Sequence, residues 1–379
     1  MIYFVYCTTG CNLHCTYCGN DPEEMCMPLL PQYSVEELQA FIERDFKASG
    51  GAKPTLVLYG GEPLVNFRFV EQLLDTIDAT FILQTNACFL EKLSKKHIER
   101  FASILVSIDG PEEVVDRRRG AGTYQKCTDG VVAALRKGTP RNLVARGTAM
   151  EGNDIYASVM HLLNHPTIPF THTYWQLNVG FDAPMRTEFE DWVKTSYNPG
   201  ITRLINEWVG LMETEGKVLG IVPFLSQIET MLQDEERGSI NLKELRPIRC
   251  GVGYNTFTIT TDAKIGGCPC GIGEKWNYLS TDFRTIENPV ESLCNRLKPK
   301  DPCTDCENAH YCGGRCLYCN VTRYWQDEYK RVVCDLTVTH LINEVKRVFP
   351  KVKELLTSGR IQREPFQYPA EDYSLEVIP

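Results

Sequence analysis

Six short apolar runs alternate with five helix-like segments over the first 180 residues, and this alternation constrains the fold more than any other feature. The runs that predict strands are Ile2–Tyr6, Thr55–Tyr59, Thr80–Gln84, Ser103–Ile108, Leu143–Ala149 and Thr171–Val179. The segments that predict helices are Ser34–Ala48, Val65–Ile77, Leu90–Phe101, Thr123–Lys137 and Asn153–Asn164. Strands separated by helical crossovers pair in parallel. The sequence therefore predicts an α/β fold whose parallel sheet is open or curls into an incomplete barrel, because six units are too few for eight-fold closure.

Two local signals predict where helices begin in this region. Glu37 follows Ser34 at a distance of three residues, which predicts a capping box at the first helix. Asn153 predicts the N-cap of the last helix. Ligands of parallel sheets bind at the carboxyl ends of the strands. Functional residues are therefore expected directly after the apolar runs.

Beyond residue 181 the sequence changes character twice. Residues 182–249 carry three helix-like patterns and predict a helical bridge: Met185–Tyr197, Thr202–Glu215 and Phe224–Arg237. Residues 250–335 hold ten of the 17 cysteines among glycine, proline and asparagine, and such a module needs metal to hold it together. Asp335–Phe349 has the spacing of an amphipathic helix. The predicted domains are thus residues 1–181, 182–249 and 250–335, followed by a C-terminal helix and tail in 336–379.

Charge and the cysteine count limit the compartment and the partners. The net charge is −9, so the chain offers no basic face for nucleic acid. No apolar run reaches the roughly 18 residues that a membrane helix needs, and the start lacks the charged region of a signal peptide. Seventeen cysteines without an export signal predict metal thiolates in a reducing compartment, the cytoplasm, rather than disulfides.

The first cysteine group follows the first predicted strand. Cys11, Cys15 and Cys18 are spaced Cys-x3-Cys-x2-Cys. Three thiolates on one loop can hold three irons of a [4Fe–4S] cube and leave the fourth iron open to an exogenous ligand. The spacing alone leaves a zinc loop or simply buried cysteines as alternatives.

With an aromatic residue, Tyr17, before its last cysteine, this motif resembles that of the radical S-adenosylmethionine (SAM) superfamily. The resemblance implies a partial (β/α)6 barrel, a [4Fe–4S] cluster on Cys11, Cys15 and Cys18, and SAM bound to the open iron. It also implies that one electron cleaves SAM to methionine and a 5′-deoxyadenosyl radical, which abstracts hydrogen from a substrate.

Later strand ends resemble further motifs of the same superfamily. Gly60–Pro63 reads GGEP, Thr85-Asn86-Ala87 resembles TNG with alanine for glycine, and Ser107 to Gly110 reads SxDG. The resemblance implies SAM contacts at Tyr17, Gly60, Gly61, Glu62, Pro63, Asn86, Ser107, Asp109, Arg119 and Arg146. Two alternatives remain open. Glu62 could be a first-turn helix charge, and Arg146 could form a salt bridge at the end of its strand.

The second cysteine group has a longer and more specific pattern. Cys303, Cys306, Cys312 and Cys316 are spaced Cys-x2-Cys-x5-Cys-x3-Cys, and Cys334 follows after 17 residues. Together with Cys250 and Cys268 upstream, this group resembles the SPASM module of radical SAM enzymes. The resemblance implies two auxiliary [4Fe–4S] clusters, three clusters in all. The outer cluster would use Cys303, Cys306, Cys312 and Cys334, and the inner one Cys250, Cys268 and Cys316.

Three departures from the SPASM pattern matter. Ala263 stands where a glycine is expected after the hairpin aspartate, and Pro269 stands where sulfatase-maturing relatives carry aspartate. The inner cluster has three clear ligands, and Cys270, Cys294 and Cys319 are the candidates for a fourth; without one, its iron would stay open, which in members of the family allows a substrate thiolate to bind. Paired Cys-x2-Cys half-sites also bind zinc, which remains the alternative for the whole module.

The resemblance implies a radical SAM enzyme that modifies a ribosomally made peptide or protein by crosslinking, oxidation or epimerisation. A low-potential donor of the flavodoxin or ferredoxin type would supply the electron. Because the chain begins on the first strand, no N-terminal peptide-recognition domain is expected. The alternatives are an enzyme of the same type that acts on a small molecule, and a non-catalytic iron–sulfur electron carrier. No catalytic base is identifiable: His172, Gln176, Tyr254 and Asp262 are polar positions of a kind that usually serves structure.

Overall fold

The computed structural model describes residues 1–19, 26–178, 187–237, 250–300, 303, 306–322 and 330–367. These residues divide into two compact units. The first unit consists of Met1–Ile108, Glu112–Val144 and Gly251–Lys298, and the second of Asp109–Pro111, Ala145–Cys250 and Pro299–Pro379. Each unit is described by itself.

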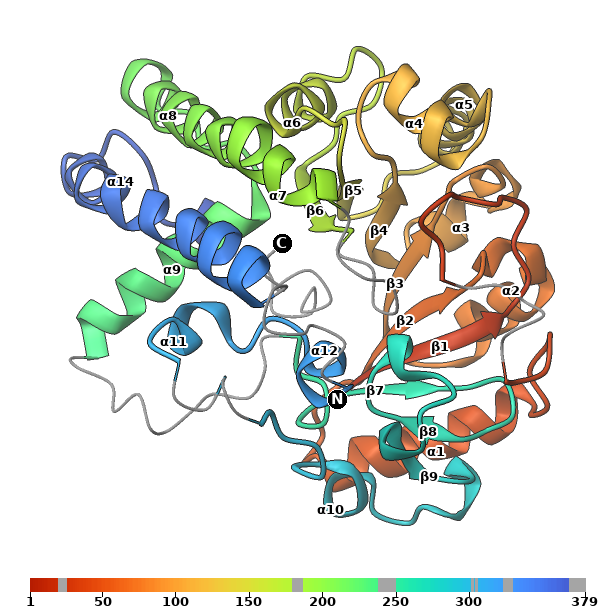
Figure 1. Ribbon diagram of the computed structural model, residues 1–379. Helices are drawn as coiled ribbons and strands as arrows, with labels where there is room; N and C mark the ends of the chain where they lie inside the picture. Colours follow the sequence, from red (N-terminus) through yellow and green to blue (C-terminus); the bar gives the residue numbers. More distant parts are fainter. Residues whose placement is uncertain are drawn as a thin grey trace. The chain divides into compact units, whose positions relative to one another are not determined.

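A mostly parallel sheet forms the centre of the first unit (Figure 1). Its strand order is β4-β3-β2-β1-β7-β8-β9. The strands are β1 (Ile2–Thr8), β2 (Thr55–Gly60), β3 (Thr80–Thr85), β4 (Phe101–Ser107), β7 (Thr256–Ile259), β8 (Ile265–Gly266) and β9 (Tyr278–Ser280). Strands β1 to β4 and β7 run parallel to their neighbours, while β8 pairs antiparallel with β7 and β9. The predicted parallel sheet is therefore confirmed, and its first four strands lie where the apolar runs predicted them.

The helices of the first unit are α1 (Val35–Ala48), α2 (Phe67–Thr76), α3 (Lys95–Ile98), α4 (Glu112–Arg119), α5 (Thr123–Leu135) and α10 (Pro289–Leu293). Three predicted crossovers of this unit are helical as expected, one is not, and two further helices, α4 and α10, lie where none was predicted. The capping box is present, since Ser34 and Glu37 exchange both expected hydrogen bonds. The single helix predicted over Leu90–Phe101 is wrong. A short 3-10 turn ends at Lys92, Ser94 caps the four-residue α3, and Phe101 already begins β4.

The second unit is largely helical and contains the end of β5 (Asn142–Ala149) beside β6 (His172–Leu177). Its helices are α6 (Ile155–Leu163), α7 (Thr187–Trp192), α8 (Asn198–Glu215), α9 (Val222–Arg237), α11 (Ala309–Cys312), α12 (Leu317–Thr322) and α14 (Thr339–Thr357). Helices α8 and α14 run alongside each other (Figure 1). The core there is apolar and aromatic, and its largest fully buried side chain is that of Trp208, which donates to the Leu219 carbonyl at 3.0 Å.

Helix boundaries in this unit differ from the predictions in three places. Asp154, not Asn153, caps α6, because its side chain accepts from Ala157 N at 3.0 Å. A π-helical turn over Val193–Tyr197 joins α7 to α8, so the two predicted helices form one run. A second π-helical turn over Lys330–Val338 precedes α14. The predicted ends at Val179 and Met185 lie outside the described residues. Among the helices described, none is long and apolar enough to cross a membrane.

His172, the first residue of β6, should make the folding stability depend on pH in the acid range. Burial lowers the pKa of His172 from 6.5 to about 4. The unfolded chain therefore binds a proton between about pH 6.5 and pH 4 that the folded chain does not. The contribution of His172 to stability should be unchanged above pH 6.5 and fall as the pH drops through this window, by at most about 3 kcal/mol. Denaturant unfolding at pH 7.5 and pH 4.5 tests this. His172→Gln should lose that part of the acid dependence, and an unaltered pH profile would contradict the assignment.

Candidate active site

The loop after β1 carries three cysteines close together. Leu13 N donates to Cys11 Sγ at 3.4 Å, and Cys18 N donates to the Cys15 carbonyl at 3.0 Å. The pKa of the Cys11 thiol is raised to about 11, mainly by burial. The Leu13 amide opposes this shift, and the nearby Glu62, Cys15 and Cys18 add to it. The three thiols thus lie near enough for their charges to repel one another. They can ionise together only when a cationic group joins them.

The donor set on this loop fits an iron–sulfur cube. Within the described residues, which include all 17 cysteines, no three His, Cys, Asp or Glu side chains converge on one point as ligands of a single ion do. The thiolates of a cube bind separate irons and need not meet at one point. Cys11, Cys15 and Cys18 thus offer three neighbouring thiols on a partly exposed loop, a donor set that a four-iron cluster with one open iron could use.

Glu62 connects the ends of β2 and β3 behind this loop. Its side chain is fully buried, and both oxygens accept hydrogen bonds from the chain itself. Oε1 accepts from Leu64 N at 3.0 Å and from Thr85 Oγ1 at 2.8 Å, and Oε2 accepts from Asn86 N at 2.7 Å. Burial raises the Glu62 pKa to about 7, while these donors lower it. The carboxylate therefore holds two strand ends in register, whether or not it also meets a ligand.

The two glycines before Glu62 allow β2 to pack against the start of the cysteine loop. Gly61 N donates to the Thr8 carbonyl at 3.0 Å, and Glu62 N donates to the Gly10 carbonyl at 2.9 Å. A β-carbon on Gly60 would lie 2.2 Å from the Thr8 carbonyl oxygen, and one on Gly61 2.4 Å from that of Gly10. Gly60 also has a φ of 135°, which other residues rarely adopt. Gly60 and Gly61 thus allow the end of β2 to pack directly against the backbone of Thr8 to Gly10.

Gly61→Ala should destabilise the fold and loosen the cysteine loop together. The new methyl group overlaps backbone oxygen, which cannot rotate away, so we expect a loss of about 3 kcal/mol. Gly210→Ala is the matched control, because Gly210 lies inside α8 and a β-carbon there meets nothing within 4 Å. It should gain about 0.5–1 kcal/mol from helix propensity. Denaturant unfolding measures both, and equal stability of the two variants would contradict the close approach.

Asn86 links the end of β3 to the cysteine loop. Its backbone binds Glu62, and its side-chain Nδ2 donates to Asn12 Oδ1 at 2.9 Å and lies 3.9 Å from Cys11 Sγ. Ala87, which stands in place of the expected glycine, has a φ of 62°. It therefore adopts the left-handed conformation for which glycine is suited, at a cost of about 1–2 kcal/mol.

A tight turn after α4 supports the loop from its other end. The Arg118 carbonyl accepts from Thr16 N at 2.8 Å, and the buried Arg119 guanidinium lies 5.4 Å from the centre of the Tyr17 ring. Asp116 fixes this turn by accepting from Gly122 N and Tyr124 N at 2.6 and 2.8 Å. Asn12, Thr85 and Asp116 were not among the predicted contacts of the cluster or SAM, although Thr85 belongs to the TNG-like motif. The available signal was that Asn12 lies between Cys11 and Cys15 and that Asp116 precedes Arg119 by three residues.

Ser107 ends β4 and is half-buried, while Asp109 lies in the second unit. Asp109 Oδ1 accepts from Thr148 N at 2.8 Å, and the void that Asp109 lines with Tyr174 measures only about 10 Å³. That is roughly the space of one water molecule. The Asp109 carboxylate is therefore held against β5 through the Thr148 backbone.

Arg146 on β5 is partly buried and faces two residues of β6. Its guanidinium donates to Gln176 Oε1 at 3.3 Å and lies 5.6 Å from the centre of the Tyr174 ring. The pKa of Tyr174 is raised to about 12, mainly by burial. The nearby Arg146 and Arg315 oppose this shift, and Cys250 adds to it. The strand end therefore offers a positive charge near the first residue of the cysteine-rich segment. A planar guanidinium at such a position can bind a carboxylate.

Three cysteines of the outer set lie near one another in the second unit. Burial raises the pKa of Cys334 to about 11, Arg315 lowers it, and Cys303 and Cys306 raise it. Cys312 ends α11 in a small apolar cluster with Val338 and Ile342. Cys334, Cys303 and Cys306 are close enough for their thiolate charges to repel one another. Like the three thiols of the first loop, they would ionise together most easily around a cationic group such as a cluster.

Ligands predicted for the inner cluster are distributed over both units. Cys250 and Cys316 belong to the second unit and Cys268 to the first. Cys268 is buried, and its backbone forms a reciprocal pair with the Asn277 side chain at 2.7 and 2.9 Å. It follows the predicted hairpin, in which Ala263 has a φ of 68° where a glycine was expected. The hairpin itself, β7 and β8, is confirmed.

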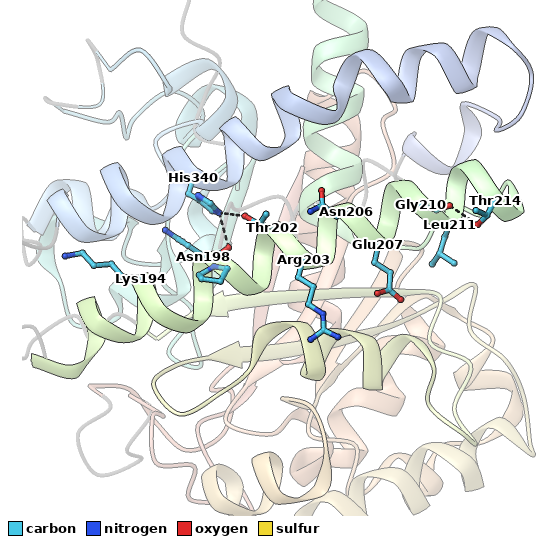
Figure 2. Close-up of a pocket in the computed structure, with 11 residues that line it drawn as sticks. Lys194, Asn198, Thr202, Arg203, Asn206, Glu207, Gly210, Leu211, Thr214 and His340 are labelled. Carbon is cyan, nitrogen blue, oxygen red and sulfur yellow. Dashed lines mark hydrogen bonds between the residues drawn. The ribbon is translucent and has the colours of Figure 1, made fainter.

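A cavity of about 870 Å³ lies along α8 and contains none of the predicted site residues (Figure 2). Most of the residues that line it are of polar types, but the surface they expose to it is mostly apolar. His340 from α14 bonds there with Thr202 Oγ1 and the Asn198 carbonyl, both at 3.0 Å.

Comparison with known proteins gives a family match for the N-terminal part of the chain. Residues 5–155 match the Radical SAM superfamily. An uncharacterised protein of Methanothermobacter thermautotrophicus is 24% identical over 177 residues, which cover 42% of this chain. The match spans 65% of the length of that relative.

Solved structures share the fold over most of the chain. The structure of anSMEcpe with bound AdoMet has a TM-score of 0.65 at 16% identity, covering 92% of this chain and 100% of that one. SuiB of Streptococcus suis bound to its precursor peptide SuiA has a TM-score of 0.57 at 14% identity, covering 86% and 74%. The sequence-based assignment of the family and of the fold is thereby confirmed. The family match thus covers residues 5–155, where the predicted motifs lie, and a [4Fe–4S] cluster and SAM are the cofactors that this family implies.

Proposed function

We propose that this chain uses SAM-dependent radical chemistry to modify a ribosomally made peptide or protein. The observation that carries the proposal is the loop of Cys11, Cys15 and Cys18, which is tied through Asn86 to Glu62 at the ends of β2 and β3. In this proposal the three thiolates hold the cluster, whose open iron binds SAM. A reduced cluster bound there with SAM would supply the one-electron chemistry by which radical SAM enzymes take hydrogen from a substrate.

In this proposal the residues around the loop fix its position and meet SAM. Asn86 and Asn12 hold the loop to β3, and Arg119 with Tyr17 closes its far end. Arg146 provides a guanidinium for the carboxylate of SAM, and Gly60, Gly61 and Pro63 shape the backbone beside its amino group. Ser107 and Asp109 complete the set of SAM contacts that the motifs predict. Preorganised donors of this kind act by positioning the ligand.

The peptide substrate is proposed from two lines of support. The fold is shared with structures that hold peptides, namely anSMEcpe with Kp18Cys peptide and SuiB with SuiA. The cysteine-rich segment also carries the full SPASM set of seven cysteines. In this proposal Cys303, Cys306, Cys312 and Cys334 hold the outer auxiliary cluster, and Cys250, Cys268 and Cys316 hold the inner one. Those clusters would accept the electron released when the substrate is oxidised.

A direct experiment tests the function. The full chain is isolated anaerobically, reconstituted with iron and sulfide, and incubated with SAM, dithionite and a synthetic copy of a short peptide encoded beside its gene. We expect 5′-deoxyadenosine together with a mass change in the peptide. Formation of 5′-deoxyadenosine without any mass change would contradict that peptide as substrate. Absence of both with a fully loaded enzyme would contradict the radical chemistry. In the cell a flavodoxin or ferredoxin of the cytoplasm would replace dithionite.

A further inference from the structure

Cys319 lies against Cys316 at the start of α12. The two residues form a Cys-x2-Cys pair, and the Cys319 side chain is only 2% exposed. The Cys319 thiol donates a hydrogen bond to the Cys316 sulfur, which also accepts from the backbone amides of Tyr318 and Cys319. A soft thiolate ligand that is buried in contact with another is placed to bind the same metal group. From the sequence alone, Cys319 was one of three candidates, with Cys270 and Cys294, for the fourth ligand of the inner cluster.

The position of α12 is fixed by its contact with another predicted ligand segment. Asn320 Nδ2 donates to the Lys300 carbonyl at 2.7 Å, and Asn320 Oδ1 accepts from Lys300 N at 2.6 Å. The same Lys300 carbonyl accepts from Cys303 N at 3.2 Å. Hydrogen bonds of this kind orient metal ligands before the metal arrives. The backbone around Cys319 is therefore preorganised together with the cysteine-rich segment.

The other two candidates have different surroundings. Cys294 Sγ lies 3.6 Å from the Met1 thioether, and the nearby Asp45 carboxylate raises its pKa in addition to burial. Cys270 is exposed. Cys319, by contrast, is buried and in contact with a predicted ligand, Cys316.

We propose that Cys319 is the fourth cysteine ligand of the auxiliary cluster that Cys316 holds. This inference rests on the proposed function, because it requires that auxiliary cluster. A cluster with four cysteine ligands has no open iron, so it carries electrons and does not bind substrate. The substrate class is thereby widened, since the modified peptide needs no cysteine to act as a ligand of this cluster.

The test uses a background in which the SAM cluster is removed, Cys11→Ala, Cys15→Ala and Cys18→Ala together. This full chain should hold about eight irons in two auxiliary clusters. Cyanide is the probe for an open iron, and electron paramagnetic resonance (EPR) of the reduced protein is the readout. Cys319→Ala, Cys270→Ala and Cys294→Ala are compared in that background, each checked for folding by circular dichroism. Cys319→Ser is added because a serine oxygen keeps the cluster bound more weakly.

We expect no cyanide response with Cys319 intact. In Cys319→Ala we expect either a new cyanide-dependent signal or a loss of about four irons from a folded chain. Cys319→Ser should keep its iron with altered g-values. A cyanide response with Cys319 intact, or the same changes in Cys270→Ala or Cys294→Ala instead, would overturn the proposal. A background chain that holds zinc and no iron would instead overturn the auxiliary clusters of the proposed function.

Discussion

We expect Cys15→Ala to remove about four of roughly twelve irons per chain and to abolish SAM cleavage. The physical reason is that two thiolates remain for a cluster that the loop holds with three. The remaining irons and their absorbance near 400 nm should persist, because the auxiliary cysteines lie outside this loop in the sequence. Iron analysis and the yield of 5′-deoxyadenosine after dithionite reduction measure the two effects.

Cys26→Ala is the matched control for that substitution. Cys26 is exposed and belongs to neither predicted cysteine set. Its replacement should leave iron content and SAM cleavage unchanged. If Cys15→Ala retained all of its iron, or if Cys26→Ala lost as much, the cluster would not be held by the Cys11–Cys18 loop.

Glu62→Ala should be the most destabilising of the substitutions at the motif residues. It leaves Leu64 N, Thr85 Oγ1 and Asn86 N without acceptors in a fully buried place. Each unsatisfied buried donor costs about 1–3 kcal/mol, and partial relaxation should limit the total loss to about 3–5 kcal/mol. Urea unfolding of the apoprotein measures it without any contribution from cofactors.

Glu62→Gln and an exposed control separate the two roles of this carboxylate. Glutamine keeps the volume and one oxygen but turns an NH₂ group towards Asn86 N, so an intermediate loss is expected. Glu43 is exposed on α1, and Glu43→Ala should change stability by less than about 0.5 kcal/mol. If the apoprotein of Glu62→Ala were as stable as the Glu43 control but bound SAM weakly, Glu62 would be a ligand residue only.

Much of the first unit could be predicted because its signals are local. Alternation of apolar runs and helical spacing located β1 to β4, and the Ser34–Glu37 pair located the start of α1. The helix predicted over Leu90–Phe101 failed because Ser94 provides a cap that restarts the helix and Phe101 belongs to the sheet. Asn153 and Asp154 are both good caps, and only the backbone geometry decides between them.

Long-range partners could not be predicted from the sequence pattern. The hairpin of β7 and β8 was expected, but nothing in it indicates that β7 pairs in parallel with β1. The hydrogen bonds of Glu62 with Thr85 and Asn86 also join residues that are distant in the sequence, and no local pattern indicates them. At Ala87 and Ala263, by contrast, the motif predicts the backbone conformation correctly although the residue differs from the expected one. Their family motifs call for glycine, and the backbone keeps the left-handed conformation although the residue has changed.

EPR of the dithionite-reduced full chain, recorded with and without SAM, tests whether the Cys11–Cys18 loop holds a cluster with an open iron. We expect SAM to shift the g-values of one cluster's signal, because it would bind the open iron beside Cys11, Cys15 and Cys18. The same addition should change nothing in Cys15→Ala. A spectrum that SAM leaves unaltered in the native chain, or that SAM alters equally in Cys15→Ala, would contradict that expectation.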